Sequence, residues 1–204
     1  MDEHKEIVEQ LLAFIPASAC DKMAQAIIDC NVKLTITKKR KTKLGDYRAP
    51  FKDIKYHRIS VNGDLNPEMF LLVLIHEMAH LEVHVSHGRK AKAHGEEWKQ
   101  AYREWYEAYR NDFSRHAQQI IDKHFKNLKA TTCNDPELTR ELMYKDHDEE
   151  VTLLNDLQSG EVFETQGRAF KVLNKRRTRF LCEEIASKKR FLVSGSAQVV
   201  RLNE

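Results

Sequence analysis

The sequence predicts an α+β fold, with a mainly helical core, a small three-stranded sheet, a central helix and a small C-terminal β module. Three observations lead to this expectation. Apolar residues recur at helical spacing in most of the first 128 residues, but they alternate with polar residues between positions 32 and 63. From residue 161 onward, five short alternating runs follow one another within about 40 residues, as in a small SH3-like barrel.

The N-terminal part of the core predicts two helices and three strands. Residues 3–15 have helical spacing and end at Pro16, and residues 19–30 predict a second short helix. Three strands should follow as a meander, and their sequences are VKLTITKKR, KLGDYRA and HRISVNG.

The central helix has a clear start. Asn66 can cap it, Pro67 suits its first position, and Glu68 favours the positive end of the helix dipole. The helix is apolar nearly all round, which indicates burial. Residues 84–93 are polar and predict a loop or a frayed end, before another helix that runs with breaks from position 96 to about 128.

The domain boundaries follow from composition. The core takes residues 1–130, and an acidic linker takes 131–160, with a short helix near 136–143. The β module takes residues 161–204, and its five predicted strands are EVFET, RAFKVLN, RFLCEEI, RFLVS and QVVRL.

Composition and charge suit a soluble intracellular protein. The formal net charge of +3 makes no case for nucleic acid by itself. The four cysteines are far apart and form no CxxC pair, which argues against a disulfide framework or a zinc ribbon. The polar N-terminus is unlike a signal peptide, and no run approaches the roughly 18 apolar residues of a membrane span. We expect a cytoplasmic protein, or a nuclear one in a eukaryote, without a membrane partner.

The stretch VLIHEMAHLEV, residues 73–83, places two histidines and a glutamate in an apolar run. On a helix His76 and His80 point the same way, at the spacing with which two imidazoles bind one zinc ion. Zinc lowers the pKa of a bound water to about 7, and Glu77 is placed to take its proton and pass it to the leaving amine. Burying three such groups without a partner is costly, so we expect a metal site rather than structural histidines.

A third protein ligand must come from elsewhere in the chain. The metzincin pattern fails, because Val83 and Ser86 stand where it needs glycine and histidine. A histidine four residues after His80 continues the helical series, but three ligands on one straight helix converge poorly on a tetrahedral ion. Of the two glutamates on the following helix, the second is better placed. The residues alone leave open His84, His87, His94, Glu96 and Glu97.

The run LIHEMAHLEV…AKAHGEEWK resembles the SprT-like (Spartan-type) zinc metalloprotease family. In that family an HExxH helix is followed, after a short insertion, by HGxxW or HGxxF, whose histidine completes the zinc site. The resemblance implies a zincin-like core with Zn²⁺ as cofactor, His76, His80 and His94 as ligands, and Glu77 as the catalytic residue. It covers about residues 5–125, and the KLGDY and HRISVNG segments are its weaker part.

Two basic stretches are candidate nucleic-acid contacts. KKRKTK, residues 38–43, has five positive charges in six, and residues 168–190 hold nine basic and two acidic side chains. The first stretch could also be a nuclear address, and a solvated hairpin end is the interpretation to set against both. The cysteine pairs of the family's usual C-terminal zinc ribbon are missing, so a DNA-dependent role is not carried over. The candidate contacts are Lys38, Lys39, Arg40, Lys41, Arg176, Arg177 and Arg179.

The sequence therefore predicts a zinc-dependent metallopeptidase with Glu77 as general base, acting on proteins that include nucleic-acid-associated ones. The alternative is a non-catalytic zinc-containing protein that binds nucleic acid or protein. A structural zinc site would not need the glutamate, which favours the enzyme. We expect Trp98 to pack the following helix onto the catalytic one. Candidates to stabilise the oxyanion are Tyr102, Arg103 and Tyr106.

Overall fold

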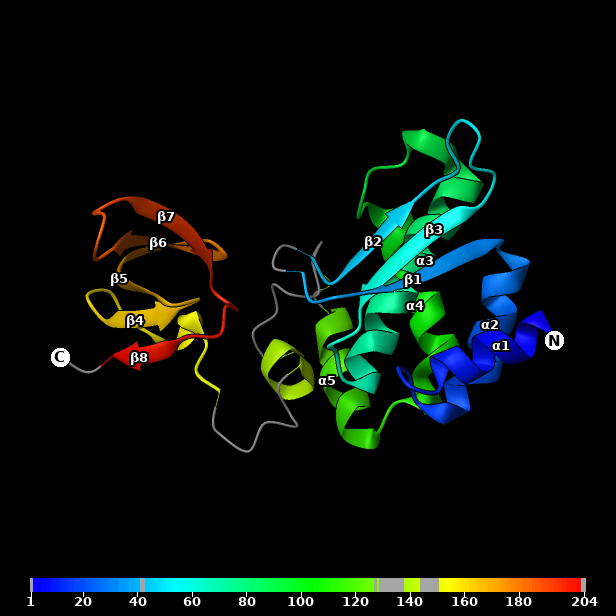
Figure 1. The fold of residues 1–204 in the computed structure, drawn as a ribbon, viewed down its shortest axis with the longest axis horizontal. Coiled ribbons are helices and arrows are strands. Elements are labelled where there is room, and N and C mark those ends of the chain that lie inside the picture. Colours follow the sequence, from blue (N-terminus) through cyan, green and yellow to red (C-terminus); the bar gives the residue numbers. More distant parts are fainter. Residues whose placement is uncertain (1, 41–42, 127, 129–137, 144–150, 203–204) are drawn as a thin grey trace. The chain divides into compact units, whose positions relative to one another are not determined.

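The computed structural model describes residues 2–40, 43–126, 128, 138–143 and 151–202 (Figure 1). The chain forms two compact units, residues 1–128 and residues 129–204. Helices, a small three-stranded sheet and a separate five-stranded antiparallel sheet give the mixed α+β architecture that the sequence predicts.

Two short helices open the first unit. α1 (Glu3–Leu11) begins where the Asp2 side chain accepts a hydrogen bond from the His4 amide. It is shorter than predicted, because the chain turns ahead of Pro16 and a residue before proline disfavours helical backbone. α2 (Ala17–Asp29) follows directly and buries one face, made of Ala19, Cys20, Met23, Ala24 and Ile27.

A mixed three-stranded sheet follows, made of β1 (Val32–Thr37), β2 (Gly45–Arg48) and β3 (His57–Asn62). The strand order is β1-β3-β2, with β1 parallel and β2 antiparallel to β3. The three strands are as predicted. The prediction that they form a meander is wrong, because β1 pairs with β3 and not with β2. The segment after β1 does not turn back along it, because the Arg40 guanidinium donates to Asn62 Oδ1 at 2.7 Å and to Ser60 Oγ at 2.9 Å. β2 therefore becomes an outer strand of the sheet.

α3 (Pro67–His87) is the central helix of the first unit and packs against β2, β3 and α4 (Figure 1). Its start is as predicted: Asn66 Oδ1 accepts from the Met69 amide at 2.9 Å, and Pro67 occupies the first turn. The prediction of a loop that starts at residue 84 is wrong, because the helix continues to His87. Gly88 ends it with a positive φ of 64°, which glycine adopts without a steric cost.

α3 is also long and apolar enough, by length and composition alone, to cross a membrane, although the sequence suggested no such run. In its 18-residue apolar window, 72% is buried within the structure. The core helix of a soluble protein passes the same test, so the feature is weak evidence for a membrane span.

α4 (Glu96–Tyr109) and α5 (Arg115–Lys126) complete the first unit. Trp105 is only half-buried, and its indole N–H donates to Glu82 of α3 at 2.6 Å. The stripe that packs α4 into the core consists of Trp98, Tyr102, Tyr106 and Tyr109.

The second unit is built on a five-stranded antiparallel sheet with the order β7-β6-β5-β4-β8. All five strands coincide with predicted runs. Among the described residues, the pairing leaves β7 and β8 as the outer strands, and closure into an SH3-like barrel stays a prediction. The strands are β4 (Val162–Thr165), β5 (Arg168–Arg176), β6 (Arg179–Glu184), β7 (Arg190–Ser194) and β8 (Val200–Leu202).

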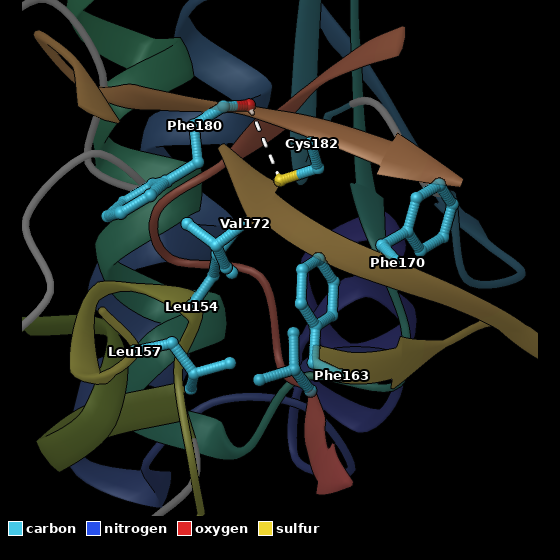
Figure 2. Close-up of a cluster of buried hydrophobic side chains, with 8 residues drawn as sticks. Leu154, Leu157, Phe163, Phe170, Val172, Phe180 and Cys182 are labelled. Atoms are coloured by element: carbon cyan, nitrogen blue, oxygen red, sulfur yellow. Dashed lines mark hydrogen bonds between the residues drawn. The ribbon is translucent and has the colours of Figure 1, made fainter. Parts of the chain in front are cut away.

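Aromatic and aliphatic side chains form the core of this unit (Figure 2). The rings of Phe163 and Phe170 stack with centroids 5.5 Å apart, and Leu154 and Leu157 pack into the same cluster. Part of the segment expected as a linker is therefore built into the β unit. Of the predicted helix near 136–143, the described part contains a π-helical turn at Thr139–Met143. Residues 136 and 137 lie outside the described residues.

Candidate metal centre

His76 and His80 lie one turn apart on α3, with ring centroids 5.0 Å apart. Because α3 is apolar nearly all round, the imidazole of His76 is buried, and that of His80 is half-buried. The two rings therefore lie on one face of the central helix, as the four-residue spacing predicts.

His94 approaches them from the segment that leads into α4. Its Nε2 atom lies 3.0 Å from Nε2 of His80, and its ring centroid is 5.4 Å from that of His76. The backbone of His94 has a positive φ of 61°, a left-handed conformation that costs a non-glycine residue stability. Gly95 then starts α4 as its N-cap residue. The chain thus turns sharply at the position that aims this imidazole at α3.

The three histidines could hold a metal ion. Their candidate ligand atoms all lie within 4.8 Å of one another. Two nitrogens bound to one tetrahedral zinc at about 2.05 Å each would be about 3.3 Å apart, close to the observed separation of the His80 and His94 nitrogens. Imidazole nitrogens suit zinc and several other transition metals. The donor set therefore fits a metal of this class.

Burial lowers the pKa of all three imidazoles. For His76 the pKa falls well below its usual value, first through burial and then through His80 and His94. The pKa of His80 falls to about 4, through burial and His94, and that of His94 falls through burial. Neutral imidazole is the form that binds metals. The environment thus favours the ligating form of each ring near neutral pH.

Trp98 packs against all three imidazoles. Its ring centroid is 4.7 Å from that of His76, 5.3 Å from His80 and 4.5 Å from His94. The side chain is only 1% exposed. Trp98 therefore packs α4 onto α3, as expected, and it does so at the histidine cluster itself.

The other proposed third ligands lie apart from this cluster. His87 is exposed in the last turn of α3, and Glu96 is exposed and pairs with Lys99 at 2.6 Å. Glu97 is also exposed. His84 lies beside β2 and β3, with its ring centroid 6.1 Å from Tyr47 and 6.2 Å from His57. In the described part of the chain, His94 is the one of the five candidates that joins the group.

The side chain of Glu77, on α3, is buried against β2. Its carboxylate accepts a hydrogen bond from the Tyr47 backbone amide, and its side chain packs closely against Gly45. A Cβ atom at Gly45 would lie 2.4 Å from Glu77 Oε1. Burial raises the pKa of Glu77 to about 8, Asp46 adds to this, and Arg40 opposes it. A nearby positive charge would favour the carboxylate form.

The contact of β2 with Glu77 was not predicted from the sequence. Only a glycine at position 45 lets the strand backbone approach the carboxylate this closely. Tyr47 was not singled out either, and its hydroxyl is 2.9 Å from His57 Nδ1. A glycine next to a strand pattern could have suggested a close backbone approach, but not to which residue.

The candidate oxyanion residues all bond within the helical core. Tyr102 donates to the Leu72 carbonyl at 3.4 Å, and Arg103 donates to the Phe125 carbonyl at 3.3 Å. Tyr106 donates to Asp122 Oδ1 at 2.7 Å. These contacts tie α4 to α3 and α5.

The basic candidates fall into two groups. Arg40 is fixed to β3 and also donates to the Leu44 carbonyl, so it holds the segment that leads into β2. Lys38 and Lys39 are exposed, and Lys39 pairs with Asp64 at 3.4 Å. Lys41 lies outside the described residues. The second group, Arg176, Arg177 and Arg179, lies at the turn between β5 and β6.

Comparison with known families agrees with this geometry. The family model described as SprT-like family matches residues 18–134, more than half of the chain. The chain belongs to the SprT-like family. This match spans β1 to β3, α3, α4 and His94, so the residues of the histidine cluster all lie inside the SprT-like region. Searches of curated proteins and of solved structures found no match.

Proposed function

We propose that the chain is a zinc-dependent metallopeptidase that hydrolyses peptide bonds of a protein substrate. The observation that carries the proposal is the convergence of three imidazole donors within 4.8 Å, together with the buried carboxylate of Glu77, which directly follows the first of these histidines on α3. Catalytic zinc sites have three protein ligands and an open position, whereas structural sites are usually closed by four. Membership of the SprT-like family supports a metallopeptidase-type enzyme.

Each residue has a separate task in this proposal. His76, His80 and His94 would hold the ion, and the bound ion would supply Lewis-acid chemistry by polarising the substrate carbonyl and lowering the pKa of a water to about 7. Glu77 takes a proton from the attacking water on its carboxylate and gives it to the leaving amine nitrogen. The Tyr47 amide holds that carboxylate in place through its hydrogen bond.

Glu77→Gln tests the catalytic assignment. The amide keeps the size of the side chain but cannot accept the proton, so cleavage of an unfolded protein substrate should fall at least about a hundredfold. Zinc content, measured by mass spectrometry, should stay near that of wild type. Glu97→Gln is the matched control, because it makes the same chemical change at an exposed position close in sequence to the cluster. A Glu77→Gln protein that cleaves at the wild-type rate would refute the proposal.

A non-catalytic zinc protein that binds nucleic acid or protein is the second candidate. The exposed arginines of the β unit favour it. In that case wild type would bind zinc but cleave no substrate, and Glu77→Gln would change nothing measurable. The two functions can also coexist, because a basic β unit could bring the peptidase to proteins that are associated with nucleic acid.

A further inference from the structure

The turn between β5 and β6 surrounds a hollow of about 360 Å³ on the second unit. Three of its five lining residues are arginines, and all three are exposed. The hollow is therefore lined mainly by positively charged side chains. Its lining is Arg176, Arg177, Thr178, Arg179 and Leu192.

These arginines have no acidic partner in the described part of the chain. Elsewhere in the same unit basic side chains are paired: Arg168 bonds Glu184 at 2.6 Å, and Arg201 lies 3.2 Å from Glu161. At the turn, by contrast, Arg176 and Arg179 are directly opposite each other across β5 and β6. Like charges in this position destabilise a sheet. The fold thus keeps two opposed arginines at a cost in stability, which a bound anion would remove.

The lining of the hollow also includes one apolar side chain, that of Leu192. Leu192 is 52% exposed and is paired across the strands with Leu181. Residues alternate between the two faces of a strand, and Phe180 is buried, so Arg179 and Leu181 share the outer face. The site therefore combines guanidinium groups with an exposed leucine surface. A nucleotide offers the matching pair of groups, a phosphate and a flat base.

Two more basic side chains lie farther along the same sheet face, beyond the uncharged residues Asn174, Leu181 and Leu192. Lys171 of β5 and Arg190 of β7 flank Glu183 on the same outer face, four residues along β6 from Arg179. At about 3.3 Å per residue, Lys171 and Arg190 lie about 13 Å from Arg179 along the sheet. Basic side chains spread over this distance suit a ligand with repeating negative charges better than one isolated anion.

The position of the arginines favours nucleic acid over an acidic peptide. An extended peptide usually adds to a sheet by pairing with the backbone of an edge strand. Arg176 and Arg179 lie on β5 and β6, which are inner strands of the described sheet. Recognition there must use side chains, and the planar guanidinium bonds phosphate oxygens in pairs and stacks on bases.

We propose that the β5–β6 turn binds the phosphate backbone of a single-stranded nucleic acid, with a base resting against Leu192. The proposal does not depend on the metal centre or on peptidase activity.

The test uses the full chain and a fluorescently labelled thymidine oligonucleotide of about 15 nucleotides, followed by anisotropy. The double variant Arg176→Gln/Arg179→Gln should raise Kd at least about tenfold near physiological salt. It should also reduce the slope of log K against log salt by about 1.4, because each lost phosphate contact on a single strand contributes about 0.7. Its Tm should be no lower than that of wild type, since an opposed pair of like charges is removed.

The matched control is Arg115→Gln/Lys126→Gln, which removes two exposed positive charges from α5. It should leave Kd within about twofold of wild type. An equal loss in this control would overturn the proposal, because net charge alone would then explain binding. Failure of wild type to bind the oligonucleotide would also overturn it. So would tighter binding of a glutamate-rich peptide that depends on Arg176 and Arg179, since the occupant would then be an acidic protein segment.

Discussion

Replacing Gly45 by alanine tests whether β2 holds Glu77 in its working position. The added Cβ atom would lie 2.4 Å from Glu77 Oε1, 2.8 Å from its Cγ and 2.8 Å from Val73 Cγ1. Non-bonded heavy atoms normally stay about 3.5 Å apart or more, so the strand or the carboxylate must move by about 1 Å. The backbone of Gly45 has no positive φ, so the substitution acts through space and not through backbone strain.

Two effects should follow from this displacement. Overpacking typically costs about 1–3 kcal/mol, so Tm should fall. A shift of about 1 Å in a catalytic group can cost about a hundredfold in rate, so kcat/KM per bound zinc should fall by that order. Zinc content should not change, because the contacts of the new methyl group are with Glu77 and Val73 and not with a histidine.

Gly63→Ala is the matched control. A Cβ atom there would lie 2.7 Å from Ile36 Cγ2 and 3.5 Å from Phe14 Cε1, a similar overlap that does not involve Glu77. It should lower Tm without lowering kcat/KM per bound zinc. If a folded Gly45→Ala protein keeps its kcat/KM within about threefold of wild type, then β2 does not position the catalytic glutamate and the reasoning fails.

Three further outcomes are expected. His94→Ala should lose bound zinc by mass spectrometry, and retention would exclude it as a ligand. Arg40→Gln should lower the free energy of unfolding in urea by about 1.5–3 kcal/mol, because it removes charged hydrogen bonds, whereas exposed Lys38→Gln should change it by less than about 0.5 kcal/mol. Arg168 holds the pKa of Glu184 down to about 2, so the carboxylate stabilises the fold above its usual pKa of 4.5 and loses that effect as pH falls towards 2. Between those pH values wild-type Tm should fall more steeply than that of Glu184→Gln, and parallel curves would contradict this.

The elements with strong local patterns were predictable from the sequence. The Asn66–Pro67 start of α3 is a short-range signal, because the cap and the first turn depend only on neighbouring residues. The five strands of the second unit alternate clearly, and their positions agree with the predicted runs. The HExxH spacing likewise places His76 and His80 on one helix face before any tertiary contact is known.

Long-range features were not predictable in this way. The parallel pairing of β1 with β3 joins residues about 25 positions apart, and no local pattern specifies it. Arg40 reads as part of a basic surface run, yet its bonds to β3 make it a structural residue. Position alone left five choices for the third ligand. His94 was chosen from a family resemblance, and only the folded chain shows its nitrogen beside that of His80. Substrate, cellular location and metal identity stay predictions.

The close approach of His80 and His94 has a consequence for the stability of the protein against unfolding and degradation. Their nitrogens are 3.0 Å apart although the residues are 14 positions apart in the chain. A metal ion that joins them would act as a cross-link between the end of α3 and the start of α4. Such a site does not exist in the unfolded chain, so binding energy becomes folding energy, about 4 kcal/mol when free metal is a thousandfold above Kd. Metal supply would then govern how long the chain resists cellular proteolysis, in addition to governing the peptidase activity proposed above.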